Sequence, residues 1–468
     1  MKKLLACIAL IAALLLTSCS GEEYIAVAFQ PLSALHIPEG VRVVGFGEET
    51  HGIHDFNALA KEVFIRLVED YGFRAFAVEG PLLKTRTVNN YILYGIGTAR
   101  DSMSFFVRWQ EGVELIEWMR AFNQAAAPGD EIRFYGIDIL GIVDRNLEIY
   151  FQFKRFVSPF AAVRDQLALG HIDYEHLTYT AWFSGIDGLL DYIAIIDNAL
   201  YEMKQNEHRY VAVKSQFEFA FALQSLKNVR WSIQGVIQEA LALKQMYEDD
   251  LDKLSDETYI FMVARHAPDF DWSAFDGREY GDIAIPAHGI TIFNFRDQKM
   301  YENIRWVVEQ EELRGHGRVF VFAHNNHVMR TPFGYGNSLI PFGVHLAESF
   351  GDAYFVIGTE FYRGTFLAYQ IIDGQQFFIE HSFVNDASEL IARFVETQMD
   401  RAVVNIHATV RAGDVLGEIL TEKQRMTTIG LVFLPYMPTR LNFAPVVPSI
   451  CYDAIIFVRY VTPLTPVN

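Results

Sequence analysis

The stretch VRVVGFGEETHGIHDFNALAKEVFIRLVEDYGF, residues 41–73, introduces the pattern that later parts of the chain repeat. Its first seven residues, VRVVGFG, predict a buried strand, and the apolar spacing from residue 57 onward predicts an amphipathic helix ending near Gly72. Between strand and helix lie titratable side chains: Glu48, Glu49, His51 and His54. A strand, a short polar connection and a helix together form the repeating unit of an α/β fold.

Four further apolar runs predict strands of the same kind. They are RAFAVE (74–79), EIRFYGID (131–138), RVFVFAH (318–324) and AYFVIGTEF (353–361). Helices are expected between some of them, over about 105–125 and over LIPFGVHLAESFG (339–351). We therefore expect an α/β fold with a largely parallel sheet flanked by helices.

Residues 151–284 depart from this alternation, because they are rich in helix formers with long apolar periodicity and carry few strand signals. We expect them to form a helical insertion or cap. The α/β core would then comprise residues 41–150 and 285–468, with residues 19–40 as a tether and lead-in. The Pro-rich tail VTPLTPVN (461–468) is expected to be a loose end.

The N-terminus has the features of an exported lipoprotein. Lys2 and Lys3 precede an apolar stretch, residues 4–16, that is short for a membrane span and typical of a signal peptide. It ends in LTSC (16–19), which resembles the cleavage box of bacterial lipoproteins and implies removal of residues 1–18 and lipidation of Cys19. We expect a protein anchored to a membrane of the cell envelope, with an ordinary secretory signal as the alternative.

Composition argues against several classes of function. With 51% hydrophobic and 21% charged residues, the chain has material for a large core. Its 58 acidic and 39 basic residues, a net charge of −19, argue against nucleic acid as a partner. If Cys7 leaves with the signal and Cys19 carries lipid, Cys451 has no disulfide partner and is expected to be a buried thiol.

Four of the expected strands deliver acids or histidines at their carboxyl ends. These are Glu48 and His51, then Glu79, then Asp138, and finally His324 with His327. In parallel α/β sheets such ends converge on one crevice, which is where ligands bind. Asp138 is expected either to take part in catalysis or to shape the site as a buried carboxylate. Glu49 is expected at a helix dipole or in solvent, and His54 and Asp55 are expected to cap the following helix.

Several familiar catalytic motifs are missing from the sequence. It contains no G-x-S-x-G nucleophile elbow, P-loop, dinucleotide glycine fingerprint or H-E-x-x-H helix. The histidines and glutamates can activate water as general base and orienting carboxylate. Because two histidines and two carboxylates are also typical zinc ligands, the residues alone leave a metal site open.

Three segments resemble the opening of the erythromycin esterase family: GEETHGIHDF (47–56), LVEDYGFRAFAVEGP (67–81) and VNNYILYG (88–95). Later segments agree in order, namely IRFYGIDI (132–139), FNFRDQKMYENIRW (293–306), VFVFAHNNHVMRTP (319–332), VIGTEFYRGTF (356–366) and SICYDAIIFVRY (449–460). The succession of G-E-x-x-H, F-x-x-E and A-H-N-x-H is a specific combination.

The resemblance implies a hydrolase that needs no metal and no cofactor and acts on a small-molecule ester or lactone. In it His51 activates water for attack on a macrolide lactone carbonyl, and Glu48 and Glu79 are its partner carboxylates. His324 and His327 complete the site and are expected to donate to the developing oxyanion. Asp138 and Arg296 are expected to support these groups.

One position departs from the family pattern. Macrolide-active relatives resemble one another in having an arginine on the helix after G-E-x-x-H, where this chain has Ala60, followed by Lys61. A displacement by one residue turns a helical side chain by ~100°. The resemblance therefore implies an ester or lactone hydrolase more firmly than a macrolide hydrolase. A haem-type ligand-binding lipoprotein and a metal-dependent peptidase remain the alternatives.

Overall fold

The computed structural model describes residues 28–100, 109–139, 185–213, 215–248, 271–278, 282–283, 285, 287–372 and 375–467. The expected signal peptide, the expected lipidation site Cys19 and parts of the expected insertion lie outside these residues.

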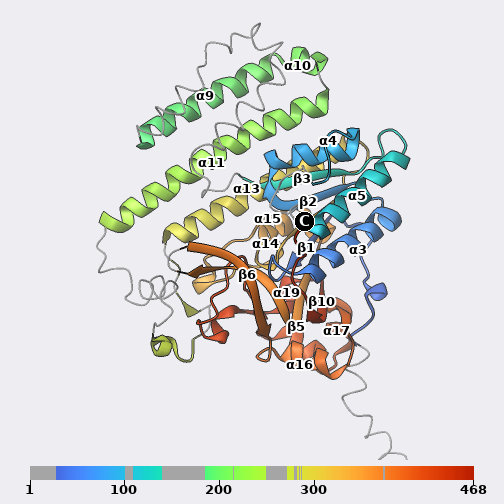
Figure 1. Ribbon diagram of the computed structural model, residues 1–468, viewed down its shortest axis with the longest axis vertical. Helices are drawn as coiled ribbons and strands as arrows, with labels where there is room; N and C mark the ends of the chain where they lie inside the picture. The colour runs from blue at the N-terminus through green and yellow to red at the C-terminus, as the bar shows by residue number, and fades with distance from the viewer. Residues whose placement is uncertain are drawn as a thin grey trace, which may run out of the picture.

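An eight-stranded sheet runs through the centre of the molecule (Figure 1). Its main path has the order β3-β2-β4-β1-β5-β10-β7, and β6 pairs with β5 beside this path. The first six strands of the path are parallel, whereas β7 is antiparallel to β10 and β6 is antiparallel to β5. The bounds are β1 Val43–Glu48, β2 Ala75–Pro81, β3 Arg133–Asp138, β4 Val319–His324, β5 Tyr354–Ile372, β6 Gln375–Val384, β7 Arg401–Asn405 and β10 Ala454–Val461.

The five expected strands are present, so the predicted α/β class with a largely parallel sheet is confirmed. The fifth, β5, is much longer than expected because its second half extends beyond its pairing with β1 and forms an antiparallel ribbon with β6. A second, two-stranded sheet joins β8 (Gln424–Thr427) to β9 (Phe443–Val446). The segment that follows β8 forms part of the wall of the site described below.

Helices cover both faces of the sheet. Their bounds are α3 His54–Tyr71, α4 Arg86–Tyr94, α5 Gln110–Ala125, α9 Gly185–Gln205, α10 Glu207–Val213, α11 Gln216–Glu248, α13 Ala287–Glu312, α14 Asn325–Val328, α15 Phe342–Phe350, α16 Glu389–Glu396, α17 Ile406–Ala412, α18 Val415–Thr421 and α19 Pro448–Cys451. In β1, Val43 packs into the core beside α13 and α15, and Val44 packs into the core beside α3 and α5. Because both faces are covered, β1, β2 and β4 are mostly apolar up to their carboxyl ends.

The helical insertion that the sequence predicts is also present. Helices α9, α10 and α11 stand at one end of the molecule, and α11 packs along α13 (Figure 1). Buried amides connect the layers, because Asn303 of α13 accepts from Gln224 and Asn228 of α11 and donates to the carbonyl of Ile137 at 2.7 Å. The boundaries at residues 151 and 284 stay a prediction. Among the helices that the structure describes, none is both long and apolar enough to cross a membrane.

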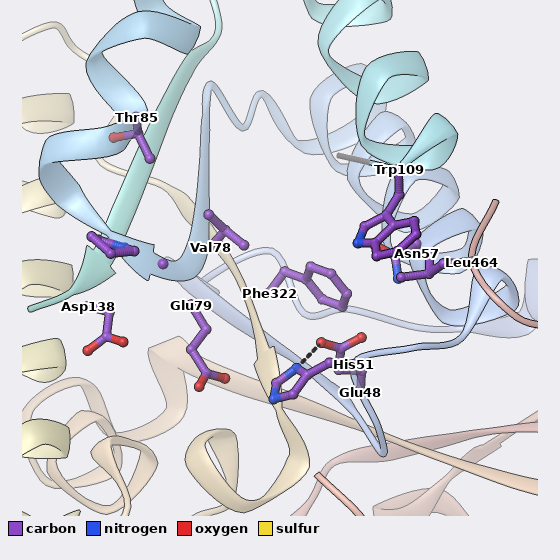
Figure 2. A pocket seen from close by; sticks show the side chains of 12 residues that line it. Glu48, His51, Asn57, Val78, Glu79, Thr85, Trp109, Asp138, Phe322 and Leu464 are labelled. Atoms are coloured by element: carbon purple, nitrogen blue, oxygen red, sulfur yellow. Dashed lines mark hydrogen bonds and ion pairs between the residues drawn. The ribbon is translucent and has the colours of Figure 1, made fainter. Parts of the chain in front are cut away.

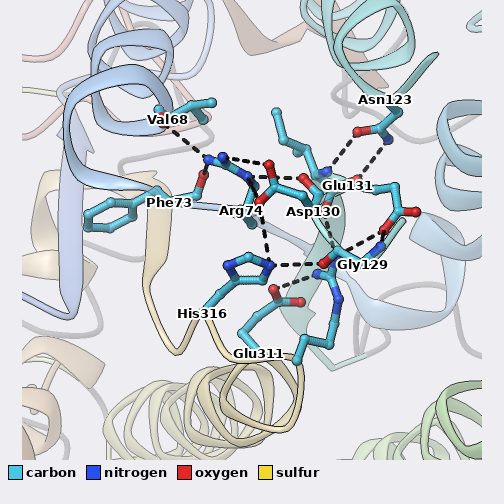
Figure 3. Close-up of polar contacts among 11 residues, drawn as sticks. Val68, Phe73, Arg74, Asn123, Gly129, Asp130, Glu131, Glu311 and His316 are labelled. Atoms are coloured by element: carbon cyan, nitrogen blue, oxygen red, sulfur yellow. Dashed lines mark hydrogen bonds and ion pairs between the residues drawn. The ribbon is translucent and has the colours of Figure 1, made fainter. Parts of the chain in front are cut away.

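The amino ends and the carboxyl ends of the parallel strands carry different groups of residues. At the amino ends of β2 and β3 a network of polar bonds closes the edge (Figure 3). Arg74 binds the carboxylate of Asp130 through Nε and Nη2 at 2.9 and 3.0 Å, and Arg314 and His316 bind the carbonyl of Gly129. These bonds join strand ends and loops to one another. The carboxyl ends hold the predicted site residues.

The lead-in and the tail both pack against the core. Gln30 exchanges two backbone hydrogen bonds with Val403 of β7, so the described part of the expected tether, residues 28–40, is part of the folded unit. The expectation of a loose end after β10 is wrong for residues 462–467. Thr462 accepts from the backbone N–H of His54 at 2.9 Å, and Thr465 accepts from that of Gln110 at 2.9 Å. The tail therefore lies across the loop that carries His51 and the start of α5.

Candidate active site

The carboxyl ends of the parallel strands bring the predicted residues together, as their topology requires. Glu48, the last residue of β1, is the direct neighbour of His324, the last residue of β4. Glu79 lies near the end of β2, and Asp138 ends β3. His51 follows β1 in the loop before α3, and Figure 2 shows its ring between the carboxylates of Glu48 and Glu79.

His51 and Glu48 form a histidine–carboxylate pair. Nδ1 of His51 lies 2.7 Å from Oε1 of Glu48, which is buried. Burial lowers the pKa of His51, but the hydrogen bond and the charge of Glu48 outweigh it, and the net pKa lies above the ordinary 6.5. No described residue bonds to Nε2 of His51, and this nitrogen is on the side of Glu79 (Figure 2). The pair therefore has the geometry of a general base held in one tautomer.

His327 and Asp297 form a second pair of the same type. Nδ1 of His327 lies 2.7 Å from Oδ1 of the fully buried Asp297, and the ring is stacked between Phe293 and Phe342. Burial lowers the pKa of His327, but the charges of Asp297 and Glu79 outweigh it and raise the pKa to about 10. At neutral pH His327 is therefore an imidazolium, a hydrogen-bond donor at both nitrogens.

Arg296 bridges two carboxylates, those of Asp138 and Glu79. Its Nη2 donates to Asp138 and to Glu79, each at 2.7 Å, and its Nε donates to Asp138 at 3.0 Å. The other oxygen of Glu79 accepts from the backbone N–H of His324 at 3.0 Å. Burial raises the pKa of Glu79, but the positive charges of His327 and Arg296 outweigh it and hold the pKa well below its usual range. Glu79 is thus a permanent carboxylate, and Asp138 positions the guanidinium.

His324 lies in the site, yet the structure does not support the donor role expected for it. Its Nε2 lies 2.6 Å from the carbonyl oxygen of Glu49 and therefore donates to it, while its Nδ1 accepts from the backbone N–H of Asn326 at 3.1 Å. Burial, together with the charges of His51 and His327, lowers its pKa to about 3. His324 is a neutral ring that joins the ends of β1 and β4 and has no N–H left for a substrate.

The expectations for Glu49, His54 and Asp55 are wrong. Glu49 is fully buried, where its Oε1 accepts from the N–H of Ile429, and burial followed by the charge of Glu360 raises its pKa well above 4.5. Neither His54 nor Asp55 caps α3, which has no side-chain cap. His54 binds Glu111 of α5 at 2.6 Å, and Asp55 accepts from Thr462 of the tail at 2.8 Å.

Two other expectations from the sequence agree with the structure. Cys451 is buried as expected, 3.0 Å from Oγ1 of Thr331, and burial raises the pKa of its thiol to about 11. A thiol of this kind is a poor nucleophile at neutral pH. Ala60, on α3, is buried in the apolar core, and Nζ of Lys61 lies 3.5 Å from Oε2 of Glu114 on α5. Lys61 therefore does not reach the cavities lined by His51, as expected.

Two cavities meet at His51 and Glu79, which line both of them. The larger cavity has a volume of about 350 Å³ and is walled by His324, His327, Arg296 and residues that follow β8. The smaller one, of about 120 Å³, extends from Glu48 and Asp138 toward Trp109 and Leu464 (Figure 2). A reacting group bound between His51 and Glu79 therefore has space on both sides.

The histidine and carboxylate side chains of the site are not arranged as the ligands of a metal ion. His51 and His327 each bind a carboxylate through Nδ1, and both nitrogens of His324 have partners. Within the described ranges, no three His, Cys, Asp or Glu side chains are placed to hold one ion.

Residues 68–461 match the sequence profile of the family described as erythromycin esterase. The chain belongs to the erythromycin esterase family. It is similar to an erythromycin esterase type II of Escherichia coli, with 26% identity over 342 residues that cover 72% of each chain. Glu79, Asp138, Arg296, His324 and His327 lie inside the range matched to the family. Glu48 and His51 precede that range, and their assignment depends on the geometry described above.

Solved structures show the same fold. A crystal structure of a Bacillus cereus protein matches with a TM-score of 0.67 at 18% identity, covering 96% of this chain and 98% of the other. A mutant of the erythromycin esterase EreC in its open conformation matches with a TM-score of 0.57 at 14% identity, covering 91% and 92%. At these identities the likeness concerns the fold alone, and the α/β architecture of the erythromycin esterase family is the architecture of this chain.

The sequence did not point to Asp297, which completes the second histidine pair. Asp297 follows Arg296 directly on α13, and the adjacent charges in the FNFRDQ segment were the available signal. Nor did it point to Trp109 and Leu464, which lie at the far end of the smaller cavity. Both are apolar residues whose role depends on how the tail folds back.

Proposed function

We propose that the protein is a metal-independent hydrolase of an ester or lactone in which His51 activates the attacking water. Family membership supports the reaction type, since curated relatives carry the name erythromycin esterase. The observation that carries the proposal is the pair formed by Glu48 and His51 at 2.7 Å, with Nε2 of His51 directed to the junction of two cavities.

The chemistry follows from this geometry. Neutral His51 accepts a proton at Nε2 from water while the water oxygen attacks the carbonyl carbon, which produces a tetrahedral oxyanion. Glu48 keeps the other ring proton on Nδ1 and stabilises the imidazolium that forms. When the carbon–oxygen bond to the leaving group breaks, the imidazolium returns its proton to the departing alkoxide. The products are a carboxylic acid and an alcohol, joined in one molecule when the substrate is a lactone.

The oxyanion requires positive charge on the other side of the junction. His327, protonated because of Asp297 and Glu79, carries an N–H at Nε2 whose contact with Oε1 of Glu79 is long, at 3.4 Å. This N–H can donate to a substrate oxygen that enters the cavity beside it, and the positively charged guanidinium of Arg296 lies 3.2 Å from the same nitrogen. Removing one such donor typically costs ~10²–10³ in turnover.

The substrate class is defined more broadly than a macrolide. Ala60 is buried in α3 and Lys61 is paired with Glu114, so the chain offers no arginine at the position found in macrolide-active relatives. The larger cavity has apolar walls, among them Ile429, Leu434 and Leu441, together with the cations described above. Such a site fits an ester or lactone of an amphipathic small molecule.

A panel of esters and lactones tests the proposal. The purified protein is incubated with erythromycin, simple lactones and simple aryl and alkyl esters, and products are followed by the mass gain of one water. We expect hydrolysis of at least one class, lost on mutation of His51. A folded protein that hydrolyses no member of the panel would overturn the proposal.

A further inference from the structure

The smaller cavity has a composition that the reaction itself does not require. One end is formed by Glu48, His51 and Glu79, and the other by Trp109 and Leu464 (Figure 2). Its volume of about 120 Å³ corresponds to roughly four water molecules at about 30 Å³ each. We infer that this cavity, the short-arm chamber, binds a short, oxygen-bearing arm of the ester and that Leu464 limits the length of that arm. The inference rests on the proposed hydrolysis and specifies its substrate.

The two cavities differ in volume and meet at His51 and Glu79, so they fit an ester whose acyl and alcohol parts differ in size. His51 and Glu79 line both cavities, so a carbonyl within reach of Nε2 of His51 lies at their junction. An ester extends in two directions from its carbonyl, through its acyl carbon and through its alcohol oxygen. One arm must therefore enter the short-arm chamber and the other the larger cavity, of about 350 Å³.

Leu464 forms a firm wall because its backbone is bound to the loop of the general base. The N–H of Leu464 donates to the carbonyl of Gly52 at 3.1 Å, and the neighbouring Pro463 forms a β-bridge with Ile53. The side chain of Leu464 is 3% exposed. Because this wall and His51 are attached to the same short loop, the distance from the base to the end of the chamber is fixed.

Trp109 supplies the polar group that the arm would meet. Its indole Nε1 is buried and has no hydrogen-bond partner among the described residues, and the indole faces the chamber (Figure 2). Buried N–H groups without a partner are rare in native proteins, since the lost hydrogen bond to water is not replaced. The ring packs against Phe378, with centroids 5.6 Å apart, and the backbone of Trp109 forms a β-bridge with Pro466. An ether, carbonyl or hydroxyl oxygen in the arm would accept from this N–H.

Two series of esters test the size limit. In one the acyl chain lengthens with the alcohol constant, and in the other the alcohol lengthens with the acyl chain constant. We expect kcat/KM of the wild type to fall with length in one series. In the same series, Leu464→Ala should raise kcat/KM for the longest esters about 10-fold or more. Leu464→Phe should make kcat/KM fall more steeply with length. Leu441→Ala removes a buried leucine from the larger cavity and is the matched control; its effect should appear in the other series.

The hydrogen bond is tested separately with Trp109→Phe, which keeps an aromatic ring and removes the N–H. Relative to an alkyl arm of equal length, an arm with an ether oxygen should lose about 5-fold in kcat/KM, the effect of a typical hydrogen bond of ~1 kcal/mol. Circular dichroism and thermal melting establish that each variant is folded. Unchanged length profiles in both Leu464 variants, or the same profile change from Leu441→Ala, would overturn the inference. If the wild type hydrolyses no ester, the proposed function itself fails.

Discussion

His51 and His327 line one cavity, and Nδ1 of each lies 2.7 Å from a buried carboxylate oxygen. The proposed mechanism nevertheless gives them different tasks. His327 has a second carboxylate, Glu79, on its other side, and its pKa rises to about 10, so it remains a cation. Burial lowers the pKa of His51, but the hydrogen bond to Glu48 and the charges of Glu48 and Glu79 raise it above 6.5. Glu79 raises the pKa of both rings through its charge, but only His327 has a contact with it, at 3.4 Å from Nε2 to Oε1. In the proposed mechanism this difference separates the base from the electrophile.

The pH profile of the wild type reports the state of His51. Because its pKa is raised, kcat/KM should increase with pH along a limb whose apparent pKa lies above 6.5. Glu48→Gln removes the hydrogen-bonded charge that raises this pKa and leaves the burial that lowers it. The limb should therefore move to lower pH while the maximal rate falls, since the imidazolium loses its stabilising charge. Profiles of both proteins check this, and a limb that stays in place in Glu48→Gln would exclude His51 as the titrating base.

Asp297→Asn tests the proposed role of His327 as the group that stabilises the oxyanion. Without the carboxylate the pKa of His327 falls, and the ring loses the proton with which it stabilises the oxyanion. Turnover should drop ~10²–10³, with a smaller change in KM. Asp130→Asn at the opposite edge of the sheet is the matched control, because Asp130 binds Arg74 far from the site (Figure 3). Equal kcat in the two variants would show that His327 does not act in the reaction.

Chelation tests independence from metal. The proposed reaction uses water activated by a histidine, so activity should persist after dialysis against a strong chelator. Elemental analysis of the dialysed protein accompanies the assay. Loss of activity that returns on addition of zinc would favour the metal-dependent peptidase instead.

Glu360 predicts a dependence of stability on pH. It is fully buried beside Glu49, and burial raises its pKa to about 7 despite hydrogen bonds from Thr427 and Asn385. The folded state therefore binds this proton more tightly than the unfolded state, and the group reduces stability as pH rises from about 4.5 toward 7. Glu360→Gln should raise Tm relative to the wild type above pH 7 and lose that advantage near pH 4. A constant difference in Tm across this range would argue against a shifted Glu360.

Localisation is proposed from LTSC (16–19) alone. The processed protein should fractionate with membranes, and Cys19→Ala should release it or leave the signal peptide uncleaved. Mass spectrometry of the N-terminal peptide identifies the lipid. A wild-type protein that is fully soluble after export would contradict the lipoprotein assignment.

The sequence predicted features that depend on local pattern. Apolar runs located five of the six parallel strands on the main path, and β10 was not predicted. The residues at the ends of the predicted strands located Glu48, Glu79, Asp138 and His324, because strand direction alone places those ends at one edge. Features that depend on distant partners were missed. Glu49 looked exposed because its burial requires Ile429 and Glu360, more than 300 residues later in the chain.

The packing of the tail (residues 462–467) and the ribbon of β5 and β6 were also not predicted from the sequence. A Pro-rich segment carries no pattern that indicates docking, and the bonds of Thr462 and Leu464 go to residues more than 400 positions earlier. The strand β6 was missed because the consecutive polar residues Glu380, His381 and Ser382 interrupt it, so it lacks the continuous apolar run of a buried strand. Asp297 was missed because the expected site residues were taken from strand ends, whereas Asp297 lies on a helix.

The central claim is that His51 is the base, and single-site kinetics test it most directly. On any substrate that the wild type hydrolyses, His51→Ala should lose at least ~10²-fold in kcat/KM, because proton transfer contributes ~10²–10⁴. His54→Ala is the matched control, since His54 lies three residues away but binds Glu111; its effect should be mild. Circular dichroism and Tm verify that both variants are folded. A kcat/KM for His51→Ala comparable to that of the wild type would contradict the mechanism.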